Sequence, residues 1–105
     1  MGELSVERVS DQAFVVTGEL DVGTIGVFDS GTAPARDAGD EVVLDLSGVT
    51  FVDSSGLGRL IDLGRTLQAR RARLVLREPS PKVRHVLEQR GLERVNLWRV
   101  EGANA

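Results

Sequence analysis

The central stretch of the chain, residues 44–61, constrains the fold most, because an apolar strand pattern changes there into a helix pattern within a few residues. Residues 44–52 read Leu-Asp-Leu-Ser-Gly-Val-Thr-Phe-Val, and residues 53–56 read Asp-Ser-Ser-Gly. Apolar side chains then recur at helical spacing up to about residue 70. The pattern therefore predicts a strand, a short turn and a helix over about 54–70.

Asp53 marks the start of this predicted helix. Its carboxylate can accept a free backbone N–H from Ser55 or Gly56, which is the role of an N-cap residue. Val52 and Leu57 then occupy the two positions of a hydrophobic staple. The apolar face of the helix is predicted to comprise Leu57, Leu60, Ile61, Gly64 and Leu67.

Ser54 and Ser55 are therefore predicted to lie in the first helical turn, with their hydroxyls near a solvent-exposed end. A phosphate is favoured there by unpaired N–H groups and the positive end of the helix dipole. Phosphorylation would add about 1.5 to 2 negative charges. Asp53 would oppose that charge, so a modified loop would present a strongly anionic surface. Plain helix-start chemistry explains the same four residues, and the sequence alone leaves both interpretations open.

Length and composition narrow the class of protein. A chain of 105 residues is expected to form a single domain, 1–105, with a polar tail at about 101–105. The net charge of −3 argues against nucleic acid as the main partner, and the absence of cysteine excludes disulfides and zinc–thiolate sites. With no long apolar run and no signal-peptide layout, we expect a cytoplasmic protein without a membrane partner. The sequence shows no exposed apolar seam that would fix the oligomeric state, and a monomer is the expectation.

The rest of the chain alternates strand and helix patterns, which predicts an α/β fold with a mixed or largely parallel sheet flanked by helices. The strand at 41–46 reads as covered on both faces. Ser80 and Pro81 suit the cap and first position of a late helix whose inward face includes Val83, Val86, Leu87 and the stem of Arg90. The remaining expected elements are strands at 3–9, 13–20 and 74–76, a short or broken helix within 23–39, and a last strand through Val95, Leu97 and Val100.

Three arginines, Arg70, Arg71 and Arg73, cluster where the central helix should end. A nucleic-acid patch is one interpretation. Cations that complement the carbonyl end of a helix explain the cluster more simply.

Enzymatic and metal sites are poorly supported. The single histidine, His85, is expected on the exposed side of the late helix, and a serine hydrolase would need a base beside its nucleophile. Asp21, Asp45 and Asp53 could gather at one sheet edge around a metal ion, but sheet-end aspartates more often form turns and caps. The glycines of 23–31 match no phosphate-binding loop. We therefore expect no enzyme activity, no cofactor and no metal.

Residues 43–58, with Asp-Ser-Ser-Gly-Leu-Gly at their end, resemble the signature of the STAS domain family, specifically the single-domain bacterial anti-sigma factor antagonists. Gly-Glu-Leu-Asp at 18–21, the strand at 73–76 and the segment 83–95 extend the resemblance over nearly the whole chain. It implies a STAS-like mixed β-sheet flanked by α-helices. The segment 23–39 departs from it, because the family shows a regular amphipathic helix there.

The resemblance also implies a function. In that family the unmodified protein binds an anti-sigma factor that is a serine kinase, which frees a sigma factor. Phosphorylation by the kinase abolishes binding, and a serine phosphatase restores it. By position, the phosphoacceptor is Ser54. The implied partner-binding residues are Asp21, Asp53, Ser54, Ser55, Gly56 and Leu57. The main rival is an unphosphorylated STAS module that scaffolds a regulatory or membrane-transport assembly, and a serine hydrolase is a weaker one.

Overall fold

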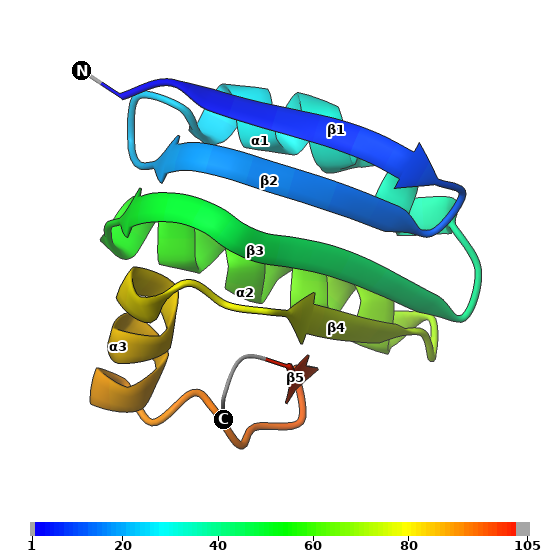
Figure 1. The fold of residues 1–105 in the computed structure, drawn as a ribbon. Helices are drawn as coiled ribbons and strands as arrows, with labels where there is room; N and C mark the ends of the chain where they lie inside the picture. Colours follow the sequence, from blue (N-terminus) through cyan, green and yellow to red (C-terminus); the bar gives the residue numbers. More distant parts are fainter. Residues whose placement is uncertain (1, 103–105) are drawn as a thin grey trace.

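The computed structural model describes residues 2–102 as one five-stranded sheet with helices on one side and at one end (Figure 1). The strand order is β1-β2-β3-β4-β5, in which β1 is antiparallel to β2 and the other neighbours are parallel. The expected α/β fold with a mixed sheet is confirmed. The elements in chain order are β1 (Leu4–Ser10), β2 (Ala13–Leu20), α1 (Ile25–Thr32), a 3₁₀ helix (Ala33–Asp37), β3 (Glu41–Val52), α2 (Ser54–Ala69), β4 (Arg73–Arg77), α3 (Pro81–Gln89) and β5 (Trp98–Glu101).

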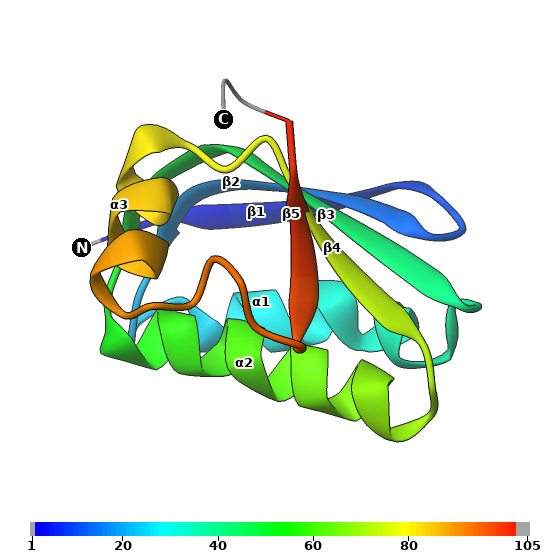
Figure 2. The ribbon, with the colours of Figure 1, turned by 90° about the horizontal axis from the view of Figure 1, so that it is seen from below.

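Helices α1 and α2 lie side by side across one face of the sheet (Figure 2). The core forms between them and the strands, because alternate strand residues point toward the helices. α3 lies beside the second half of β3, where the shorter β4 has already ended (Figure 1). The largest fully buried side chains include Phe14, Leu20, Phe28, Leu44, Leu46, Leu60, Leu74, Leu76 and Leu87.

The helix signals read from the sequence are confirmed. α2 begins after Asp53 and has Arg70 at its C-cap. α3 begins at Pro81, and the Ser80 hydroxyl accepts the backbone N–H of Val83 at 3.2 Å. Each cap depends on residues within three positions of one another, so the sequence was sufficient to predict both. The buried face of α2 adds Gly56 and Leu63 to the expected residues, and Ile61, which was expected there, is only half-buried.

Strand β3 differs from its prediction in two ways. It continues from Glu41 to Val52 instead of ending at residue 46, because Gly48 and Val49 still pair with β2. The expectation that both faces are covered holds only in part. Leu44 and Leu46 point into the core, so Val43 and Asp45 lie on the opposite face, where Val43 is buried but Asp45 is half-buried. That face of the sheet carries neither α1 nor α2 (Figures 1 and 2). The apolar run in the sequence therefore did not distinguish a strand with helices on both faces from a central strand with helices on one face.

The last strand is displaced from the predicted one. It comprises Trp98–Glu101, so Val95 and Leu97 precede the strand instead of forming it. Glu101, which was predicted to begin the polar tail, is the last residue of β5. Trp98 is 5% exposed, and its indole N–H donates to the carbonyl of Leu92 at 2.8 Å. The buried indole fixes the register of β5, which valine spacing alone did not reveal. Residues 103–105 of the predicted tail lie outside the described residues.

Segment 23–39 forms the short helix that its glycines suggested. α1 spans eight residues and passes into the 3₁₀ helix, which has Pro34 near its start. Gly31 lies against β1 so closely that a β-carbon there would come within 2.5 Å of the Val6 β-carbon. Glycine at position 31 therefore lets α1 approach the sheet closely.

The arginine cluster closes α2. Arg71 has a positive φ of 63°, and the N–H of Ala72 donates to the carbonyl of Leu67 at 2.8 Å. This is the hydrogen bonding of a Schellman C-cap. Arg70 extends from the same turn and donates to the carbonyl of Ala35 at 3.4 Å.

Glu101 of β5 forms ion pairs with Arg77 of β4 and with Arg99 of its own strand, and these contacts yield a prediction on pH. Its oxygens lie 3.0 Å from Arg77 Nε and 3.1 Å from Arg99 Nη2. Hydrogen bonds, first from Arg77 and then from Arg99, lower the pKa of the Glu101 carboxyl. A lowered folded-state pKa stabilises the fold above the unfolded-state pKa, and this contribution is lost as pH falls through the folded-state pKa.

We therefore expect Glu101→Gln to lower the melting temperature slightly at pH 7. The difference from the wild type should disappear as the pH falls below the pKa of Glu101, in thermal unfolding followed by circular dichroism. Glu93→Gln, at an exposed glutamate without an ion pair among the described residues, is the matched control and should show no such convergence.

Among residues 2–102, no helix is both long and apolar enough to cross a lipid bilayer.

Candidate functional site

The loop between β3 and α2 forms the centre of the candidate site. Asp53 Oδ1 accepts the backbone N–H of Gly56 at 2.9 Å, which confirms the predicted N-cap. Asp53 Oδ2 accepts the N–H of Val22 at 3.2 Å. One carboxylate thus joins the start of α2 to the loop before α1, a connection between residues 31 positions apart that sequence reasoning did not predict.

Asp53 should consequently contribute to stability. We expect Asp53→Ala to lower the free energy of unfolding by about 1–2 kcal/mol, because it removes an N-cap acceptor and releases the neighbouring loop. Asp53→Asn keeps an acceptor oxygen and should retain most of that stability. Denaturant unfolding of the two variants checks this, and equal losses would show that the side-chain oxygen at the cap contributes little.

Asp21 lies in the loop that Asp53 contacts. Its Oδ1 accepts the N–H of Gly23 at 2.9 Å, and its backbone N–H donates to the buried hydroxyl of Thr24 at 2.9 Å. Thr24 in turn donates to the carbonyl of Glu19 at 2.7 Å. The loop is therefore held by internal hydrogen bonds, and Asp21 and Asp53 lie at the same end of the sheet, where the family resemblance placed both.

Ser54 is the exposed serine of the pair, whereas Ser55 is half-buried. Ser54 lies between two shallow hollows. One, between α2 and α3, is also lined by Val86 and Arg90, and the other, between α1 and α2, is also lined by Ile25. The exposure of Ser54 favours it over Ser55 as a position for modification. In the sequence, the family resemblance was the only reason to choose Ser54.

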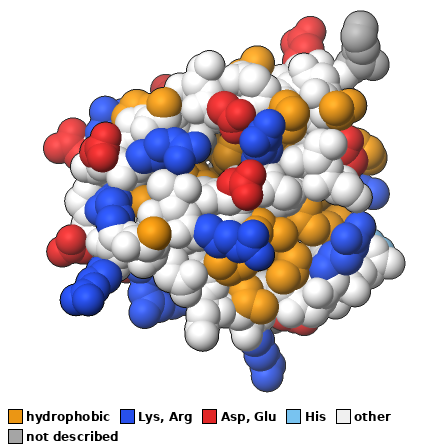
Figure 3. All heavy atoms as spheres, turned by 180° about the vertical axis from the view of Figure 1, so that it is seen from behind, with side chains coloured by type: hydrophobic (Ala, Val, Ile, Leu, Met, Phe, Trp, Pro, Cys, Tyr) orange, Lys and Arg blue, Asp and Glu red, His pale blue; other side chains and the backbone are white. Residues whose placement is uncertain are grey.

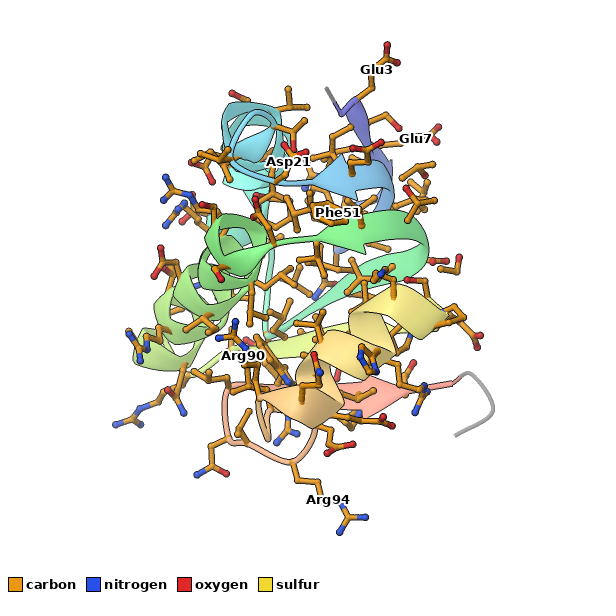
Figure 4. All side chains as sticks on the ribbon, turned by 90° about the vertical axis from the view of Figure 1, so that its left-hand side faces the viewer. Glu3, Glu7, Asp21, Phe51, Arg90 and Arg94 are labelled. Carbon is orange, nitrogen blue, oxygen red and sulfur yellow. The ribbon has the colours of Figure 1, made fainter. Side chains whose placement is uncertain are left out.

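Arg90 lies beside Ser54. Its Nη2 atom is 3.4 Å from the serine Oγ, and its side chain is exposed at the C-cap of α3 (Figure 4). The sequence placed the stem of Arg90 on the inward face of α3; in the structure Arg90 lines the hollow between α3 and α2 together with Val86 and Leu57, but its contact with Ser54 was not predicted. The two residues are 36 positions apart in the sequence, and helical periodicity does not predict a contact between residues of different helices.

Two predicted binding residues have buried side-chain positions. Leu57 is 4% exposed, and Gly56 lies against the last residue of β2, Leu20. A β-carbon on Gly56 would come within 2.7 Å of Leu20 Cγ. Gly56 and Leu57 therefore support the exposed loop from beneath, and their side-chain positions do not form its surface.

Two exposed apolar residues take part in this surface instead. Val22 is 69% exposed and Phe51 is 40% exposed. Figure 4 looks onto this end of the molecule, where Asp21 and Phe51 come from neighbouring segments. Sequence analysis missed both, although an apolar residue directly after Asp21 in a loop was a usable signal. Acidic and apolar groups together suit a protein surface as the ligand.

The structure does not support the metal site or the histidine-based site considered from the sequence. Within residues 2–102, no group of three acidic, histidine or cysteine side chains is placed to hold a metal ion. Asp45 is engaged with Ser47, whose hydroxyl donates to it at 2.7 Å. His85 is exposed, as expected, and lines a hollow with Ser47 and Pro81 that does not include Ser54. Figure 3 shows acidic and basic side chains interspersed on the side that carries α1 and α2.

The model of the STAS domain family matches residues 5–102, which is almost the whole chain. The chain belongs to the STAS domain family. Sequence similarity adds a curated relative: this STAS domain is 39% identical over 51 residues to an anti-sigma F factor antagonist of Lysinibacillus sphaericus. The match covers 49% of this chain and 44% of the relative, so the chain spans less than half the length of that protein.

Solved structures agree with this fold. The anti-sigma factor antagonist SpoIIAA in its unphosphorylated form superposes with a TM-score of 0.70 at 27% identity, over 97% of this STAS domain and 90% of SpoIIAA. The phosphorylated form, described as a Bacillus cell fate determinant, gives 0.67 at 26% identity over 95% and 92%. A putative anti-sigma factor antagonist of Thermotoga maritima gives 0.75 at 21% identity over 96% and 87%, a likeness of fold alone. These names describe regulatory antagonists, in agreement with the expected non-enzymatic role.

Proposed function

We propose that this STAS domain is an anti-sigma factor antagonist whose binding to an anti-sigma serine kinase is switched off by phosphorylation of Ser54. The observation that carries the proposal is the exposed Ser54 hydroxyl directly after the capping Asp53, at the end of the sheet that also presents Asp21. In this proposal the unmodified protein binds the kinase and frees a sigma factor. A serine phosphatase restores the binding form.

The proposed contact surface combines the two loops that Asp53 joins. Val22 and Phe51 supply exposed apolar area, and Asp21 and Ser54 supply polar groups beside it. A phosphate on Ser54 would place a charge of about −1.5 to −2 within this surface. Burying such a group against a partner without a matching cation is costly, so charge alone can prevent binding without a change of fold.

The cellular setting is part of the same proposal. The chain acts as a single domain in the cytoplasm, as a monomer, with a soluble kinase as its partner and with neither nucleic acid nor a membrane as a ligand.

Phosphopeptide mapping by mass spectrometry tests the proposal on protein isolated from its own cells, in growing and stressed cultures, with and without phosphatase treatment. We expect phosphate on Ser54, at a level that changes with growth condition, and a serine kinase among the co-purifying proteins. Persistent absence of phosphate from a well-observed peptide would contradict the switch. Co-purification with membrane-transport subunits would favour the scaffold alternative.

A further inference from the structure

Arg90 is the cationic side chain in contact with the hydroxyl of Ser54. Its guanidinium reaches that oxygen from α3, at 3.4 Å, across the hollow that Val52, Leu57 and Val86 also line. Within residues 2–102, no carboxylate forms an ion pair with Arg90. Its charge is therefore close to Ser54 and not already neutralised by another side chain.

The other charged groups around Ser54 are already engaged. Asp53 divides its two oxygens between the N–H groups of Gly56 and Val22. In the hollow on the α1 side, Arg59 lies 3.7 Å from Asp29 and 3.7 Å from Asp62. Arg59 is therefore shared between two carboxylates, whereas Arg90 has a neutral hydroxyl as its partner.

We propose that Arg90 is the built-in counter-ion of a phosphate on Ser54, so that the modified serine links the first turn of α2 to the C-cap of α3. This inference rests on the proposed phosphorylation of Ser54. An arginine fork binds phosphate oxygens through short, charge-assisted hydrogen bonds of about 2.7–2.9 Å. The Arg90 side chain is exposed and can retract to accommodate the added group.

The link has two consequences. The cation stabilises the dianionic form of the phosphate, so the second pKa of the phosphoserine falls below its usual value of about 6. It also holds phosphate oxygens against α3, which should slow removal of the phosphate by a phosphatase. The switch in this chain would thus be set at Ser54 and stabilised by a residue from a different helix.

The test uses the full chain with phosphoserine incorporated at position 54, and follows the ³¹P resonance as a function of pH. We expect the second pKa of the phosphate to rise by at least about half a unit in Arg90→Ala, and to be partly restored in Arg90→Lys. Arg94→Ala is the matched control. It removes the same charge from the chain, and Figure 4 shows Arg94 pointing away from Arg90.

Equal pKa values in the wild type, Arg90→Ala and Arg94→Ala would overturn the proposal, and so would equal rises in the two variants, since the effect would then be one of net charge. Circular dichroism confirms that each protein is folded. Because the phosphate is installed during synthesis, this result is independent of whether cells modify Ser54. Failure of the proposed function would appear instead as equal kinase binding by the modified and unmodified proteins.

Discussion

Replacing Gly56 with alanine is expected to lower the free energy of unfolding by about 1–3 kcal/mol, despite the higher helix propensity of alanine. The added β-carbon would lie 2.7 Å from Leu20 Cγ and 2.9 Å from the Leu20 carbonyl carbon. The second of these atoms belongs to the backbone of β2, so relief requires α2 to move away from the strand. Urea unfolding monitored by circular dichroism measures the loss.

Gly58 provides the matched control for this substitution. It lies two residues further along α2, and a β-carbon there would have no heavy atom within 4 Å. Gly58→Ala should therefore raise the free energy of unfolding by up to about 1 kcal/mol, the helix-propensity difference alone. Destabilisation of similar size in both variants would mean that close packing against Leu20 is not the reason for glycine at position 56.

Replacing Ser54 with aspartate is expected to weaken binding to the anti-sigma kinase by about 100-fold, or about 2.8 kcal/mol, because it places a negative charge in the contact surface. Ser54→Ala should bind as tightly as the unmodified wild type. Calorimetry with the kinase that co-purifies with the wild type measures both affinities. Equal binding by the two variants would exclude a charge-operated switch at this residue.

Two features keep this experiment interpretable. An acidic residue in the first turn of a helix stabilises it by about 0.3–1 kcal/mol, so lost binding would not reflect unfolding. Ser54→Asn has nearly the size of the aspartate variant without its charge. The difference in affinity between the asparagine and aspartate variants isolates the effect of charge, and we expect most of the loss to appear there.

The proposed switch lies on a part of the structure that hydrogen bonds and close packing hold in place. Asp53 fixes the loop by hydrogen bonds to two segments, and Gly56 fixes α2 against β2. Ser54 is therefore held on a rigid support, with Val22 and Phe51 exposed near it. A rigid surface binds without a large ordering cost, and the same rigidity leaves an added phosphate little means of moving out of the interface.

Features that depend on neighbours along the chain could be predicted from the sequence. Asp53 at the start of α2 and Ser80 at the start of α3 follow from cap chemistry within three residues. The buried faces of both helices follow from their 3.6-residue period. The order of strand and helix patterns was sufficient to predict a mixed α/β sheet, because parallel neighbours require crossover connections.

Features that join distant segments became apparent in the folded structure alone. The pairing of β3 with β2 extended β3 to Val52, and burial of Trp98 fixed the register of β5. The contact of Arg90 with Ser54 depends on how α3 is placed beside β3. Neither the hydrophobic period of a segment nor a helix cap predicts these contacts, because each arises from the packing of elements around a shared core.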